Sequence, residues 1–101
     1  MVIVPFPFSD LTQAKRRPAL VLAKLQGDDL ILCQIASCLT ADCYAIPLEN
    51  SDFGSGSLRQ SSNIRPNRLF TADQQIILAK AGQLNAEKLD ETIAKLIEIL
   101  Q

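Results

Sequence analysis

Short apolar runs separated by polar segments make up most of the chain. The runs cover residues 2–8, 18–24, 30–36, 43–48, 64–70 and 76–84. Runs of this length, bounded by Gly, Asp, Asn, Ser and Pro, are typical of β-strands. Because Gln26-Gly27-Asp28-Asp29 reads as a turn, we expect residues 18–36 to form a β-hairpin.

The last segment has a different period. Its apolar residues recur at intervals of three and four, which predicts an amphipathic helix, and Asn85 can cap its N-terminus. They are Leu89, Ile93, Leu96, Ile97 and Leu100. The sequence therefore predicts a mainly β fold with a C-terminal α-helix, in the form of a small antiparallel β-barrel whose open side the helix covers.

Length and composition fit one domain over residues 1–101. Of the 101 residues, 48% are hydrophobic and 21% charged, as in an ordinary soluble globular protein. We expect a cytoplasmic protein and no membrane partner, because the sequence has no signal peptide and no apolar run of about 18 residues. With five aromatic residues and no Trp, base stacking cannot be its main means of binding nucleic acid.

The charges are unevenly placed. The net charge of −1 excludes a strongly basic nucleic-acid binder, but most of the basic residues before residue 81 fall in two runs, 15–17 and 59–68. If these runs meet in the fold, they make a local phosphate-binding field. If they stay apart, they are solvated surface.

Two residue types limit the possible chemistry. Histidine is absent, which removes the usual neutral-pH acid or base and every Ser-His or Cys-His nucleophile. Cys33, Cys38 and Cys43 are spaced by five residues and lack the Cys-x-x-Cys pattern of a zinc site, so we expect no metal and no cofactor. We interpret them as small buried strand residues or surface thiols in a reducing compartment.

Several motifs in order resemble the MazF/PemK family of toxins from type II toxin-antitoxin systems. These are VPFPFSDLTQAKRRPALVLA near the start, LILCQIAS, DFGSGSLRQSSNIRPNRLFT, and AGQL before the last helix. The resemblance implies an SH3-like barrel that forms a homodimer. It also implies a cognate antitoxin and metal-independent cleavage of single-stranded RNA, by attack of a ribose 2′-OH on the adjacent phosphate.

The resemblance also implies catalytic residues. Arg17 matches the catalytic arginine of the family, whose guanidinium can offer two parallel N–H donors to a phosphate. Without that match, Arg17 would read as a surface arginine paired with a carboxylate such as Asp10. Where the family usually has Thr-Ser or a similar pair at the end of its third strand, with the threonine implicated in catalysis, this chain has Ala36-Ser37. Ser37 is the candidate hydroxyl, with a strand-end residue bonding its own backbone as the alternative.

Further residues are candidates for RNA binding. Arg65 and Asn67 fall where some relatives carry an arginine and an aspartate, and an amide at 67 can orient a group but cannot take its proton. Lys15, Arg16 and Arg68 complete the candidate set. The alternative for the arginines of the 59–68 run is that they are ordinary solvated side chains.

Three functional hypotheses follow. The first is an endoribonuclease toxin, also called an mRNA interferase. The second is a family member that binds antitoxin or RNA but has lost turnover, because Ala36 and Asn67 depart from the family pattern. The third is a gyrase-inhibiting toxin of the CcdB type, which acts by protein binding alone.

Overall fold

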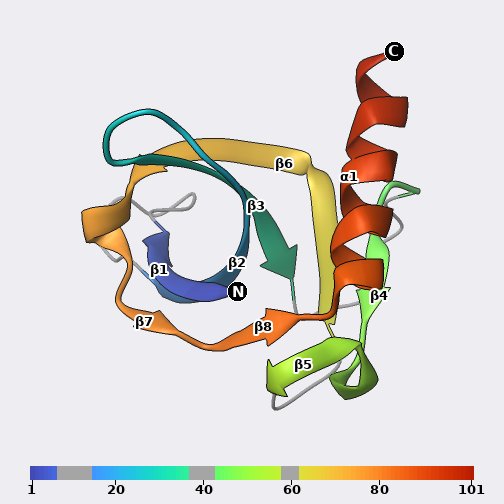
Figure 1. Ribbon diagram of the computed structural model, residues 1–101, viewed down its shortest axis with the longest axis horizontal. Coiled ribbons are helices and arrows are strands. Elements are labelled where there is room, and N and C mark those ends of the chain that lie inside the picture. The colour runs from blue at the N-terminus through green and yellow to red at the C-terminus, as the bar shows by residue number, and fades with distance from the viewer. Residues whose placement is uncertain (7–14, 37–42, 58–61) are drawn as a thin grey trace.

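The computed structural model describes residues 1–6, 15–36, 43–57 and 62–101 (Figure 1). Its elements are mainly short strands followed by one helix. In chain order they are β1 (Val2–Phe6), β2 (Lys15–Lys24), β3 (Asp29–Ala36), β4 (Ile46–Leu48), the 3-10 turn η1 (Asn50–Asp52), β5 (Phe53–Gly56), β6 (Ser62–Asp73), the 3-10 turn η2 (Gln74–Ile76), β7 (Ala79–Lys80), β8 (Gly82–Leu84) and α1 (Ala86–Leu100). This confirms a mainly β fold with a C-terminal helix. No helix among the described residues has the length and apolar character needed to cross a membrane.

All the strand pairs are antiparallel. The larger sheet has the order β4-β6-β3-β2-β1-β7, and β5 pairs with β8 in a sheet of two strands. The predicted hairpin is confirmed: β2 pairs with β3 across a turn in which Gly27 has a φ of +82°. That left-handed conformation suits glycine because it has no Cβ.

The expected strand segment at 76–84 forms two short strands instead of one. Asp73 Oδ1 accepts a hydrogen bond from Gln75 N at 2.8 Å and caps η2, which ends the preceding strand. The rest of the run divides into β7, which pairs with β1, and β8, which pairs with β5. An apolar run cannot reveal this division, because both pieces contain strand-compatible residues.

The small sheet joins the larger one through the first residue of the chain. Met1 O accepts hydrogen bonds from Ala81 N at 3.0 Å and Gly82 N at 3.4 Å. Gly56 and Gly82 face each other across β5 and β8, and a Cβ on Gly56 would lie 2.5 Å from Ala81 O. Within the described ranges, β4 and β7 are the two outer strands of the larger sheet, so its closure into a barrel stays a prediction.

The sheet carries a hydrophobic core on each face, because successive side chains of a strand alternate between faces. The first core, on the side of α1, contains Met1, Leu20, Cys33, Ile35, Ile46, Leu48, Ile64 and Leu84. The second core contains Val2, Val4, Ala19, Leu30 and Leu32. Central strands buried on both faces explain why β2 and β3 read as nearly continuous apolar runs.

Strand β6 bends sharply beside α1 (Figure 1). Cys33 of β3 pairs with Leu69, but the next residue, Gln34, pairs with Arg65, so residues 66–68 are left out of the pairing. Pro66 has no N–H to donate to a ladder, and its ring is buried. The bend divides β6 into one arm beside β4 and another beside the first half of β3.

Helix α1 begins as predicted. Asn85 Oδ1 accepts a hydrogen bond from Lys88 N at 2.9 Å. The apolar face is only partly covered, however: Leu89 packs against the first core, while Ile97 and Leu100 are 51% and 73% exposed. The C-terminal turns of the helix extend past the sheet (Figure 1).

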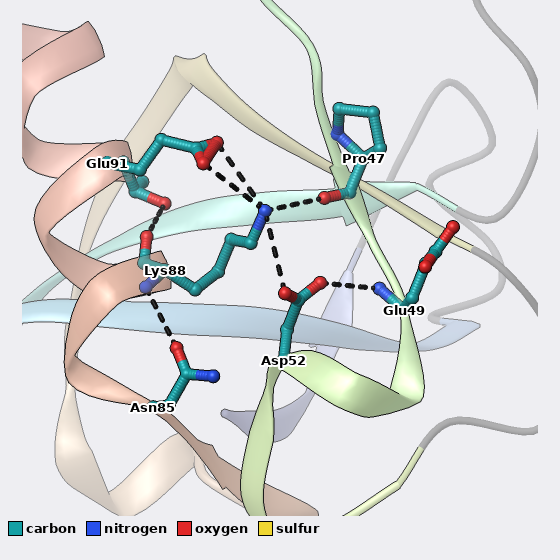
Figure 2. A network of polar contacts seen from close by, with 7 residues as sticks. Pro47, Glu49, Asp52, Asn85, Lys88 and Glu91 are labelled. Carbon is teal, nitrogen blue, oxygen red and sulfur yellow. Dashed lines mark hydrogen bonds and ion pairs between the residues drawn. The ribbon is translucent and has the colours of Figure 1, made fainter.

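Lys88 fixes the first turns of α1 against the edge of the sheet (Figure 2). Its Nζ donates to Pro47 O at 3.2 Å and lies 3.4 Å from Glu91 Oε1 and 3.7 Å from Asp52 Oδ1. Asp52 Oδ2 in turn accepts from Glu49 N at 2.9 Å. Pro47 has no N–H and its carbonyl is bound, so the middle of β4 offers little to an additional strand.

Candidate functional site

Arg17 lies near the start of β2, on the face of the second core. It pairs with Val4, and Ala19 follows it on the same face. Val4 and Ala19 are fully buried, whereas Arg17 is half-buried with its Nε atom enclosed. Arg17 therefore lies at the margin of the second core, with part of its guanidinium group shielded from solvent.

Gln34 and Arg65 form a direct pair across β3 and β6. On its other side, Gln34 pairs with Ala19 of β2. Side chains directly opposite each other on neighbouring strands share a face, with Cβ atoms about 5 Å apart. Both are half-buried, so a carboxamide and a guanidinium lie side by side on the face that carries Arg17.

Ala36 occupies the position between Arg17 and Asn63. Asn63 of β6 pairs with Ala36 of β3, and extending the β2–β3 register by two residues places Arg17 opposite Ala36. Ala36 and Asn63 are both half-buried. Arg17, Gln34, Asn63 and Arg65 thus form one set, which we call the polar face.

The ionisable side chains of the polar face are both basic. Its charged members are two guanidinium groups, and its other two members are neutral amides. The described carboxylates lie elsewhere. Asp28, Asp29 and Asp73 are at the opposite end of β2, β3 and β6, and the remaining ones are on or near α1 and η1. Two guanidinium groups with two amides are the kinds of group that hydrogen-bond a phosphate, which makes the polar face the candidate site.

The structure brings together only part of the predicted site. Arg17 and Arg65 share the polar face on strands separated by β3, so one arginine from each basic run lies there. Arg16 is exposed and one residue from Arg17, hence on the opposite face of β2. Asn67 and Arg68 are exposed in the segment of β6 left out of the pairing. Ser37 and the side chain of Lys15 lie outside the described residues.

Sequence reasoning missed Gln34 and Asn63. A signal for Gln34 was present, because it is the one polar residue within the apolar run 30–36 and has the same strand parity as Ala36. Asn63 gave no such signal, since it sits in a polar segment. Its place beside Ala36 depends on the pairing of β6 with β3.

The cysteines have separate environments. Cys33 is fully buried in the first core, and burial raises the pKa of its thiol to about 12, although a hydrogen bond with the Leu20 backbone acts in the opposite direction. Cys43 is exposed, and Cys38 lies outside the described residues. This confirms one buried strand residue and one surface thiol. In the described ranges, His, Cys, Asp and Glu form no group of three that could hold a metal ion.

These environments predict different thiol reactivities. At pH 8 in the folded protein, iodoacetamide should alkylate Cys43 and leave Cys33 unmodified, because the thiolate is the nucleophile and Cys33 is buried and protonated. In denaturant both should react. Peptide mass spectrometry after timed quenching measures each cysteine separately, and rapid labelling of Cys33 without denaturant would contradict its burial.

The fold and the polar face define a class: a small antiparallel β protein with a helix on one side of the sheet and a cationic, amide-lined surface on the other. Comparison with protein families identifies the chain at the level of sequence. The model of the PemK-like, MazF-like toxins of type II toxin-antitoxin systems matches residues 1–100. The chain belongs to this family.

Solved structures support the fold. The Mycobacterium tuberculosis toxin MazF-mt6 superposes with a TM-score of 0.67 at 18% sequence identity, over 98% of this chain and 94% of that one. A crystal structure of an Mtb toxin gives a TM-score of 0.65 at 18% identity, over 84% and 92% of the two chains. At this identity the likeness concerns the fold alone. A comparison with curated protein sequences finds no match.

Proposed function

We propose that this protein is a metal-independent endoribonuclease toxin that cleaves single-stranded RNA at the polar face. Family membership supports the class, and one structural observation supports the location. Arg17 and Arg65, far apart in sequence, share one sheet face with two amides. Guanidinium groups bind phosphate through parallel N–H donors, and amides can orient a hydroxyl.

The proposed reaction is an internal transfer within the RNA. The ribose 2′-oxygen forms a bond to the adjacent phosphorus, the bond from phosphorus to the 5′-oxygen breaks, and the proton from the 2′-OH is balanced by one delivered to the leaving oxygen. The products are a 2′,3′-cyclic phosphate and a 5′-hydroxyl. Negative charge grows on the phosphoryl oxygens as the bond forms. Arg17 stabilises this charge more strongly in the transition state than in the ground state.

The direct test is cleavage of a defined RNA by purified protein in the presence of EDTA. We expect cleavage to persist, and the downstream fragment to carry a 5′-hydroxyl that a polynucleotide kinase can label without prior phosphatase treatment. The matched control is the same RNA with a 2′-deoxy nucleotide at the cleaved position, which lacks the nucleophile. Cleavage of the deoxy substrate would refute the proposed mechanism. Loss of cleavage of the unmodified RNA when EDTA is added would also refute it.

Membership of a toxin-antitoxin family supports a cognate antitoxin, and we propose that this antitoxin covers the polar face. We also propose a homodimer as the working form. Antitoxin binding that blocks RNA binding is expected to weaken when Arg17 or Arg65 is replaced. Analytical ultracentrifugation measures the oligomeric state. We also propose that the protein acts in the cytoplasm.

One observation favours a second candidate, a family member that binds RNA or antitoxin with little turnover. Ala36 lies between Arg17 and Asn63 on neighbouring strands, and its methyl side chain makes no hydrogen bonds. Binding to uncleaved RNA with little product formation would support this candidate. The third hypothesis, a gyrase inhibitor, predicts inhibition of supercoiling by the purified protein, which neither of the other two predicts.

A further inference from the structure

We infer that Gln34 is a specificity-determining residue, whose carboxamide hydrogen-bonds the base of a nucleotide held between Arg17 and Arg65. The inference rests on the proposed function, because it assigns a role within the same RNA-binding surface. It concerns which base the protein selects, whereas the proposed function concerns whether RNA is cut.

The position of Gln34 carries the inference. It lies on β3, the central one of the three strands that form the polar face, with Ala19 opposite it on β2 and Arg65 opposite it on β6. Arg17 lies two residues before Ala19 on β2, and is therefore a diagonal neighbour of Gln34 on the same face. The direct line between the two arginines crosses β3 between Gln34 and Ala36, so a ligand that contacts both arginines passes beside Gln34, the one of these two side chains with hydrogen-bonding groups.

The spacing of the arginines leaves room for more than one phosphate. Their Cα atoms are two strand spacings apart and offset by two residues along the strands, which corresponds to about 12 Å. Their long side chains can bind phosphates on either side of Gln34. A single nucleotide chain held at both points then places one of its sugar-base units over β3, within reach of the carboxamide.

The chemistry of the carboxamide suits a base better than a phosphate. It offers both a donor and an acceptor, and base edges are distinguished by their patterns of donors and acceptors. Phosphate oxygens only accept, and the two guanidinium groups already provide cationic donors. Single-stranded RNA exposes these base edges to proteins.

The surroundings of Gln34 also favour recognition by hydrogen bonds. Its same-face neighbours Ala19 and Leu32 are buried in the second core, so the carboxamide is half-buried beside an apolar floor. Phe70, the aromatic residue of the adjoining strand on this face, is partly buried against that core. Base selection by a broad stacking platform is therefore less suited to this surface than selection by an amide.

The experiment separates base selection from cleavage. Wild-type protein and variants bind a random-sequence library of 2′-fluoro RNA, which lacks the attacking hydroxyl, and the bound molecules are sequenced. Gln34→Met removes the donor and acceptor at similar length, and Gln34→Glu keeps the shape but replaces the donor by an acceptor. Gln83→Met is the matched control, because Gln83 is an exposed residue of β8 in the small sheet.

We expect Gln34→Met to reduce the preference at one nucleotide position by about tenfold or more, with preferences elsewhere retained. Gln34→Glu should change the preferred base at that position, and Gln83→Met should leave the profile unchanged. The unfolding midpoint of each variant establishes that it is folded.

Other outcomes overturn the inference. An unchanged base profile in both Gln34 variants would show that Gln34 reads no base. Equal weakening for all sequences would show that it only positions the arginines. If the wild-type protein binds RNA base-selectively but does not cleave natural RNA, the proposed function is refuted and the inference about Gln34 is not. Absence of RNA binding by the wild-type protein would refute both.

Discussion

Replacing Arg17 by alanine should lower the rate of RNA cleavage by about 10²–10³-fold, the usual effect of removing one preorganised donor to a developing oxyanion. The loss should appear in kcat, because the charge that Arg17 stabilises is greatest in the transition state. Single-turnover cleavage of a defined RNA measures it. Arg17→Lys should restore only part of the rate, since an ammonium lacks the paired donors of a guanidinium.

Arg16→Ala is the matched control for this loss. It removes the same charge one residue away, but Arg16 is exposed on the opposite face of β2. The cleavage rate of this variant should stay close to that of the wild type. Its KM should increase slightly, because the loss of one positive charge weakens the attraction of RNA to the protein. If both alanine variants lose the same activity, the effect is one of net charge and not of the polar face. Full activity of Arg17→Ala would remove Arg17 from the mechanism.

Replacing Ala36 by threonine should raise the cleavage rate, by about tenfold or more. The position lies opposite Asn63 and, by extension of the register, opposite Arg17, so a hydroxyl there would join the polar face. One placed hydrogen-bonding group in such a site contributes up to about 10²–10³-fold. Threonine is favoured in strands, and Ala36 is half-buried, so the added atoms have an open side.

Ala36→Val separates the hydroxyl from its shape. Valine has nearly the same outline as threonine but no polar atom. Initial rates for both variants on the same RNA make the comparison. A gain with threonine alone supports a chemical role for the hydroxyl and favours the low-turnover candidate for the natural sequence. An equal gain with valine would indicate a change of strand packing, and no gain with either would show that residue 36 does not limit the reaction.

Local sequence patterns predicted the elements that depend on local interactions. The β2–β3 hairpin follows from two apolar runs and a glycine turn, and α1 begins at the residue whose side chain caps it. The run at 76–84 forms two short strands instead of one for a tertiary reason. The two strands pair with different partners, β1 and β5, and the N–H groups of Ala81 and Gly82 donate to Met1 O.

The site was harder to predict than the fold. Arg17 could be recognised from its motif, and Arg65 from its run of basic residues, but nothing local relates the two. The shift of register between Cys33 and Gln34 decides which part of β6 meets β3. It places Arg65 on the polar face and leaves Asn67 and Arg68 in the unpaired bend, although all three belong to one basic segment.

By itself, the sequence determined the class of fold, the family, the hairpin and the capped helix, because each depends on a local pattern or motif, and it marked Arg17 as the candidate catalytic residue. Only the tertiary structure decided that Gln34 lies between Arg17 and Arg65, that Arg16 faces away, and that Ala36 adjoins Asn63. The physical reason is that hydrogen-bond register between distant strands sets which side chains share a face. A shift of one residue would move every side chain of a strand to the other side of the sheet.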